Sequence, residues 1–525
     1  MKIYDLANNS LFLRNWRERM RMQNIASYLL IFSLVVVLII TYSYLAPASP
    51  GGVCPRGGGR TLSTAHDPAV SSVLGLCILQ QLIILLFAVF SAYKAAESEK
   101  TGGTLDFHRA SPTKINRQVL GLLLGSVCME WFLFFVNFLI IVILALIKGV
   151  PILPILNFEI SLIICALFFH SFAVFVGMFG NSKNRNVGAA QLFGIMYLFS
   201  ALMAVSHISF IYHLTWLPGY DQLQKALTGN ESFLFGPRNY NAGSEYSDLS
   251  YMIFGFKVNS LILQIIVQVP LLALFASAVG RRILSPERPA ITKSQAVCTV
   301  LFVLFLYSGS SFSSTLMGLS RAYEFNIYPY LVGILGVFGA YIITPSKLLF
   351  LKGLRKAKRS GIKKTSWSDD NSTNAYWVLM FGVIAVMLFA FYAILFKLSL
   401  KEYIVCSFII VSYPAFFAFF LEWFNFSQYY KKTIIFLSIL IIFWAVVPFI
   451  GFTLKDFFYY NFNVNYFSAF SPFTGLYLVS LMLSPSNLNF IELLPVLQVT
   501  FIMLFSAWLL SYLQRIEIKK DIWGK

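Results

Sequence analysis

Charged side chains are scarce in this chain. Only 12% of its 525 residues are Asp, Glu, Lys or Arg, whereas soluble globular proteins carry roughly 25%. Its hydrophobic share is 58%, about 305 residues, against roughly 45–50% in soluble proteins. This composition excludes soluble enzymes, fibrous proteins and disordered chains. It predicts an all-α polytopic membrane protein, since the apolar residues suffice for about a dozen spans of about 20 residues each.

Residues for metal or nucleophilic chemistry are also few. The chain has six cysteines and five histidines, and no cysteine pair has the spacing of a zinc or thioredoxin motif. A phosphate-binding P-loop ends in Gly-Lys-Ser/Thr, and the glycine-rich segment 51–60 lacks that ending. The sequence therefore predicts no metal, no cofactor and no ATPase within this chain, which is not expected to be an enzyme.

Apolar runs long enough to cross a bilayer occur twelve times, in two groups of six. The first run is not a signal peptide, because about 26 residues precede it and no small-residue cleavage site follows directly. We interpret the interrupted run at 466–484 as a re-entrant or surface segment. The twelve runs lie at about 27–46, 72–93, 119–147, 158–180, 187–210, 258–280, 296–312, 327–345, 376–396, 403–424, 433–453 and 492–514.

Acidic residues are outnumbered by basic ones, 22 against 40, which gives a net charge of +18. With the N-terminus in the cytoplasm, the inner segments hold about 30 Lys and Arg and the outer ones about 10. This alternation predicts that both termini are cytoplasmic and that the basic excess faces anionic lipid. Nucleic acid is not an expected partner.

The two groups of spans have similar layouts, which predicts two six-helix pseudo-repeats. In each group the second span leads into the longest basic inner segment, and a long outer segment separates the fifth span from the sixth. Before the first span, Ser10–Asn24 has the period of a basic amphipathic helix that lies in the membrane interface. The predicted domains are an interface helix (1–26), a first half (27–284), a cytoplasmic linker (285–295) and a second half (296–525).

The first long inner loop carries the most informative pattern. Glu97 and Glu99 precede a Gly-Gly-Thr break, a short helix follows, and Pro112 ends it before the third span. The helix dipole favours carboxylates at the N-terminal side of such a helix. From the residues alone, a solvated charged loop is the simpler interpretation.

The pattern Glu-x-Glu-(x)3-Gly-Thr-Leu-Asp-(x)5-Pro resembles the inner loop of type-2 permeases of ATP-binding-cassette exporters. The resemblance implies that the loop couples the membrane domain to cytoplasmic ATPase subunits, two copies or a pair, which bind ATP and Mg. It also implies two permease halves fused in one chain and a hydrophobic or amphiphilic substrate such as a drug, antibiotic, peptide or lipid. Separate permease and ATPase chains favour a bacterial plasma membrane. The matching positions are Glu97, Glu99, Gly103, Thr104, Leu105 and Pro112.

The second half departs from that pattern. Its inner loop has no carboxylate before Asp369 and is basic instead, with Lys352, Arg355, Lys356 and Arg359. A partner ATPase could therefore dock asymmetrically, or the basic loop could bind anionic lipid. The sequence leaves both open.

Ionisable groups within predicted spans are candidates for function, because charge at membrane depth is costly. Glu130 lies about eleven residues into the third span, roughly 16 Å along it, and His170 of the fourth span could pair with it. A structural polar cluster and a role in transport are both open. Glu422 is expected to be an interfacial anchor, and His207 and His213 are expected to lie at the outer interface.

Two other functions compete with the exporter. A gradient-driven twelve-span secondary transporter suits two six-span halves, but it predicts several acidic groups near the midplane. A membrane-embedded enzyme or scaffold would need a clustered catalytic set, which the sequence does not offer.

Overall fold

The computed structural model describes residues 10–45, 68–110, 113–179, 213–228, 250–285, 289, 291–316, 323–361, 369–395, 399–427 and 494–523. These residues are helical apart from short connections and one hairpin of β1 (Ser250–Ile253) and β2 (Phe256–Asn259). The chain divides into two units. The first contains Met1–Tyr251 and Lys257–Pro286, and the second contains Met252–Phe256 and Glu287–Lys525.

Seven helices in the described part of the chain are long and apolar enough to cross a membrane. Their length and composition establish a multi-pass helical membrane protein, because a span needs about 20 apolar residues. The seven candidates are Met22–Leu45, Pro68–Thr101, Cys128–Lys148, Ile152–Phe179, Ser260–Leu284, Leu400–Phe426 and Leu494–Lys520.

The other five predicted spans differ from these. The run at 327–345 corresponds to a helix pair bent by 64°, which makes an eighth candidate if the pair is one span. The runs at 296–312 and 376–396 correspond to shorter apolar helices, and those at 187–210 and 433–453 lie outside the described residues, as does 466–484. The twelve-span repeat therefore stays a prediction.

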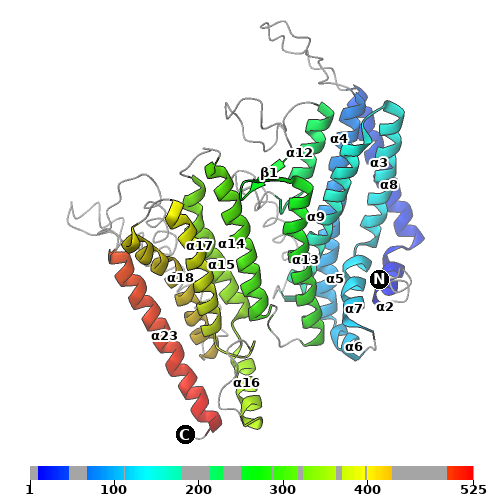
Figure 1. Ribbon diagram of the computed structural model, residues 1–525. Helices are drawn as coiled ribbons and strands as arrows, with labels where there is room; N and C mark the ends of the chain where they lie inside the picture. Colours follow the sequence, from blue (N-terminus) through cyan, green and yellow to red (C-terminus); the bar gives the residue numbers. More distant parts are fainter. Residues whose placement is uncertain are drawn as a thin grey trace, which may run out of the picture. The chain divides into compact units, whose positions relative to one another are not determined.

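The first unit is a bundle of long helices (Figure 1). Its helices α3 (Met22–Leu45), α4 (Pro68–Gln81), α5 (Ala88–Thr101), α8 (Cys128–Lys148), α9 (Ile152–Phe179) and α13 (Ser260–Leu284) are accompanied by the shorter α12 (Leu217–Thr228). A π-helix, η2 (Leu82–Phe87), joins α4 to α5. Gly177 of α9 lies close against the Tyr93 carbonyl and Ala96 of α5. Small residues of this kind let membrane helices approach each other.

Three short helices lie at one end of this bundle: α2 (Ser10–Arg19), α6 (Thr104–Ala110) and α7 (Ile115–Gly125) (Figure 1). The predicted amphipathic helix over Ser10–Asn24 is therefore shorter than expected, since α2 ends at Arg19 and α3 begins at Met22. α2 packs against α7, with Phe12 beside Gly125.

The third span starts later than predicted, because the helix is broken. The chain leaves the helical path at Ser126 and Val127, next to a Gly125-Ser126 pair of the kind that kinks helices. Helix α8 then contains 21 residues, which at 1.5 Å per residue is about 31 Å, enough to cross the hydrocarbon core alone. The span begins at Cys128 rather than at 119.

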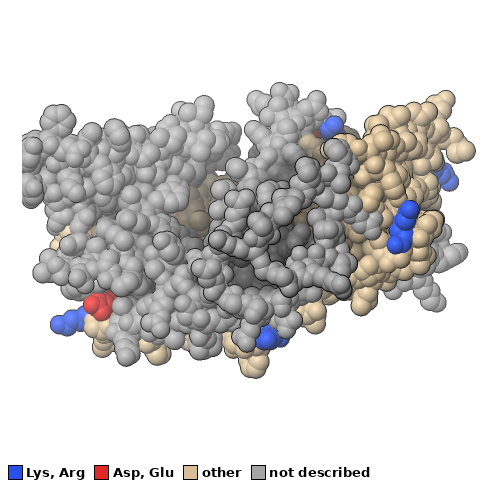
Figure 2. Space-filling model, turned by 90° about the horizontal axis from the view of Figure 1, so that it is seen from above, with Lys and Arg blue, Asp and Glu red and all other residues tan. Residues whose placement is uncertain are grey.

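In the second unit, α18 (Leu400–Phe426) packs against α15 (Tyr323–Ile343), α17 (Ala375–Leu395) and α23 (Leu494–Trp523). Helix α14 (Lys293–Leu316) packs on α15 and α17. After α15, Pro345 cannot continue the helix, and α16 (Lys347–Arg359) starts in a new direction with Ser346 as its N-cap. The described surface seen from above carries charged side chains only at isolated points (Figure 2).

Candidate functional site

A glycine hinge follows α5. Gly102 ends that helix, and Gly103 adopts a left-handed backbone with φ of 71°, which glycine tolerates without strain. The chain thereby reverses into α6 only three residues after Thr101. The predicted break and short helix are thus found in the structure, whereas Pro112 lies outside the described residues.

Glu99 is the centre of a buried polar cluster at this hinge. Its carboxylate is only 6% exposed and accepts hydrogen bonds from Thr104 Oγ1 and from His108 Nε2, the latter at 3.1 Å. It also forms an ion pair with Arg14 of α2, a helix distant in sequence. We define Arg14, Glu99, Thr104 and His108 as the elbow cluster. The expected solvated loop is therefore wrong at Glu99, since every partner of this carboxylate is a protein side chain.

Two further contacts fasten α6 to the bundle. Gln118 of α7 donates its side-chain amide to the His108 carbonyl at 2.9 Å, and Arg109 Nε donates to the Ile283 carbonyl at the end of α13 at 2.7 Å. A helix of seven residues is too short to be stable by itself. The bonds of His108, Gln118 and Arg109 hold it against α5, α7 and α13, and Glu99 links the same place to α2 through Arg14.

Glu97 does not belong to the elbow cluster, although the sequence pairs it with Glu99. It is 4% exposed, and its charge acts on Lys100 one turn away. Leu105 is also buried, and it packs into the apolar core of the first unit. The two carboxylates therefore have different surroundings.

The surroundings of His108 favour its neutral ring. Burial and the nearby Arg14 guanidinium lower the pKa of His108 below its usual value of about 6.5. The neutral ring can still donate its Nε2 hydrogen to Glu99. The elbow cluster then holds one carboxylate and one guanidinium, with a neutral donor between α6 and α5.

Glu130 and His170 do not pair, contrary to the expectation from their positions. Because α8 begins at Cys128, Glu130 lies in the first turn of that helix rather than deep within a span. It accepts hydrogen bonds from Ser91 of α5 and from Arg19 of α2, whose Nη1 lies 3.3 Å away. Glu130 thus links α2 to the spanning helices α5 and α8.

His170 forms its hydrogen bond with a different element, the π-helix η2. Its Nε2 lies 2.9 Å from the Ile84 carbonyl, inside the π-helix η2. A π-helix displaces carbonyls from the usual i→i−4 ladder, so a buried carbonyl needs a side-chain donor. His170 supplies it, and Trp131 packs edge-on against the ring.

The basic residues of the second inner loop share one exposed face of α16, namely Lys352, Arg355, Lys356 and Arg359. The opposite face is apolar and buried. Phe350 stacks on Phe426 of α18 at 4.8 Å between ring centres, and Leu354 packs with Ile518 of α23. Helix α16 therefore holds its basic face outward by apolar packing.

A second polar cluster, which the sequence did not indicate, ties the second unit together. The Nζ atom of Lys293 donates to the carbonyls of Asp369, Ser372 and Thr373, at 2.7 to 3.0 Å. Because every residue has a backbone carbonyl, the sequence carries no motif that marks the acceptors of Lys293. The site could therefore not be predicted from the sequence.

Glu422, which was expected to be an interfacial anchor, belongs to the same region. It is fully buried, accepts the backbone N–H of Asn374 at 3.1 Å, and lies 3.4 Å from Arg515 Nε of α23. His213 is buried as well, with Ser260 Oγ at 3.1 Å, and His207 lies outside the described residues.

Glu159 of α9 is a further buried carboxylate, one that the sequence analysis passed over. It is 3% exposed and accepts a hydrogen bond from the Gln80 side-chain amide of α4 at 3.0 Å. Asn137 of α8 lies in the same interface, where its amide donates to the Leu76 carbonyl at 2.9 Å. The span was expected to begin at 158, which placed Glu159 at its edge, whereas α9 begins at Ile152.

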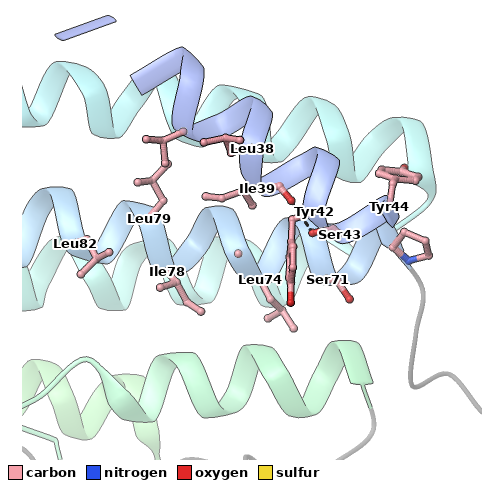
Figure 3. A pocket seen from close by; sticks show the side chains of 13 residues that line it. Leu38, Ile39, Tyr42, Ser43, Tyr44, Ser71, Leu74, Ile78, Leu79 and Leu82 are labelled. Carbon is pink, nitrogen blue, oxygen red and sulfur yellow. Dashed lines mark hydrogen bonds between the residues drawn. The ribbon is translucent and has the colours of Figure 1, made fainter. Parts of the chain in front are cut away.

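A cavity of about 860 Å³ lies between α3 and α4 (Figure 3). Its walls are apolar along most of their length, as at Leu38 and Ile78, while Tyr42, Ser43 and Ser71 cluster at one end. The size is that of a pocket for a small molecule. Such a surface suits a molecule that is apolar with a polar end.

Comparisons with known proteins identify no relative of this chain. No protein-family profile, no curated protein and no solved structure matches it.

Proposed function

We propose that this chain is the membrane permease subunit of an ATP-driven exporter of the ATP-binding-cassette type. It lies in a plasma membrane, with both termini in the cytoplasm. The membrane is bacterial, because the permease and its ATPase are separate chains. Two cytoplasmic ATPase subunits, identical or a pair, bind ATP and magnesium and drive it. Its passenger is hydrophobic or amphiphilic, such as a drug, antibiotic, peptide or lipid.

The observation that carries this proposal is the attachment of α6 through Glu99. The short helix is bonded to α5, α7 and α13 through His108, Gln118 and Arg109, and Glu99 in turn forms an ion pair with Arg14 of α2. A force on α6 from a cytoplasmic partner would therefore reach two spanning helices and the interface helix together. This arrangement is what a coupling element requires.

The cavity between α3 and α4 supports the proposal that the passenger is hydrophobic or amphiphilic. Apolar walls with hydroxyl groups at one end match an amphiphile better than a sugar or an ion. The basic face of α16 supports contact with anionic lipid or with an acidic surface of the ATPase.

The experiment is gentle purification of the full chain from its own membrane, followed by identification of co-purifying proteins. We expect a soluble ATPase whose hydrolysis depends on the permease and is lost in the double variant Glu97→Lys, Glu99→Lys. Glu517→Lys is the matched control, because it reverses an exposed charge on the same predicted side. An ATPase that never co-purifies, or that ignores the double variant, contradicts the proposal.

A gradient-driven secondary transporter is the second candidate, and Glu159 is the observation that favours it. Such transporters use buried carboxylates in spanning helices. Vesicles that contain only this chain distinguish the two functions: uphill transport driven by a proton or sodium gradient alone supports the second candidate.

A further inference from the structure

Five carboxylates are buried in the described spanning helices, and their partners differ. Glu99 forms an ion pair with Arg14, and the charge of Glu97 acts on Lys100. Glu130 lies 3.3 Å from an Arg19 nitrogen, and Glu422 lies 3.4 Å from an Arg515 nitrogen. Glu159 has only the neutral amide of Gln80 as its hydrogen-bond donor. Among these five described carboxylates, the other four have an arginine or a lysine nearby, whereas the described partner of Glu159 is a neutral amide.

The surroundings of Glu159 have more acceptor atoms than donors to fill them. The Gln80 amide nitrogen is shared between Glu159 Oε2 at 3.0 Å and the Phe134 carbonyl at 3.4 Å. Three buried oxygens then lack a hydrogen-bond donor, one each on Glu159 (Oε1), Gln80 (Oε1) and Asn137 (Oδ1). They come from three helices, α9, α4 and α8.

A bare carboxylate in this place would be very unfavourable. Burial of an unpaired charge away from water is so costly that the group neutralises instead. A proton on Glu159 Oε1 removes the charge and at the same time turns an unpartnered acceptor into a donor. One proton therefore both removes the charge and adds a donor at Glu159.

We propose that Glu159 is an intramembrane proton-binding site that holds its carboxyl in the neutral form at pH 7. The reaction is the simple equilibrium between the acid and a carboxylate plus a free proton. The π-helix that begins at Leu82, two residues after Gln80, is a second feature of this place, since such helices are frequent at functional sites. The proposal holds whichever energy source drives the protein.

The first test is infrared spectroscopy of the full chain in lipid vesicles at pH 7. The carbonyl stretch of a protonated carboxyl is compared between the native chain, Glu159→Gln and Glu130→Gln. We expect the band to lose intensity in Glu159→Gln and to keep it in Glu130→Gln, the matched control paired with Arg19. An unchanged band in Glu159→Gln overturns the proposal, as does a shift of a carboxylate band on adding sodium, which would indicate a cation site.

The second test uses dicyclohexylcarbodiimide, which takes the proton of a neutral carboxyl onto its nitrogen and binds the carboxyl oxygen at its central carbon. Mass spectrometry then finds the added reagent on the peptide. We expect labelling at Glu159 that is lost in Gln80→Lys, whose ammonium group would stabilise the carboxylate, and kept in the neutral variant Gln80→Met. Equal labelling in both variants contradicts the proposal. Neither test depends on the ATPase. A negative result in either test therefore contradicts the proton-binding site and leaves the proposed function unaffected.

Discussion

The two units fasten their short surface helices in opposite ways. In the first unit, α6 has seven residues and is held by the charged and hydrogen-bonded side chains of the elbow cluster. In the second unit, α16 has 13 residues and is held by an apolar face against α18 and α23. The difference indicates that a helix too short to present an apolar stripe needs polar anchors, whereas a helix of more than three turns does not.

This contrast matters for how each helix responds to its surroundings. Polar anchors weaken with salt and pH, because they depend on charge. Apolar packing depends on area removed from water and is insensitive to both. The first unit should therefore be the one that responds to a change of solution conditions.

The largest expected effect is on α16. Phe350→Ala removes a ring that is 1% exposed and stacks on Phe426, so we expect the free energy of local opening of α16 to fall by about 3 kcal/mol. Hydrogen exchange of the α16 amides measures it. Lys356→Ala on the exposed face is the control, with an expected change within about 0.5 kcal/mol. Equal effects of the two variants would contradict the claim that apolar packing holds α16 in place.

A smaller effect is expected at the elbow cluster. Glu99→Gln removes the charge that binds Arg14, and because Arg14 is half exposed we expect α6 to lose only about 1–2 kcal/mol of local stability. Hydrogen exchange of α6 at low and high salt measures it. Asp106→Asn is the matched control, since its carboxylate is 80% exposed and pairs only locally with Arg109. If high salt loosens α16 as much as α6, the polar anchoring of α6 is contradicted.

The smallest effect concerns pH. The pKa of His108 is lowered in the folded state, so on acidification the ring takes up its proton more readily when α6 is detached. We therefore expect the attachment of α6 to weaken as pH falls below about 6.5, while α16 stays unchanged. Exchange rates between about pH 7.5 and 5.5 measure this, and His108→Gln should abolish it. A stronger attachment at low pH would mean that Glu99 and a charged His108 form an ion pair instead.

Sequence patterns predicted what is local. The Gly-Gly break and the start of α6 follow from neighbouring residues, and the structure shows both. The partner of Glu99 could not be predicted, because Arg14 is far away in sequence. The depth of Glu130 was misjudged, because a continuous apolar run hid the helix break before Cys128.

Glu159 and Lys293 were missed for different reasons. Glu159 lies seven residues beyond the start of α9, and only that earlier start places it inside the helix. Lys293 binds backbone carbonyls, which every residue possesses, so no side-chain motif marks its site. Both show that burial, rather than residue type, decides which ionisable groups matter in this protein.

Helix α3 adds a last consequence. Only 11% of its most apolar stretch is buried, so the outer wall of the cavity beside α4 is a helix that touches mainly hydrocarbon chains. Detergents that strip away annular lipid should therefore disturb this wall before any other part of the first unit. The thickness and fluidity of the bilayer would then set the width of the cavity between α3 and α4, so the surrounding lipid would help to determine the structure of the first unit.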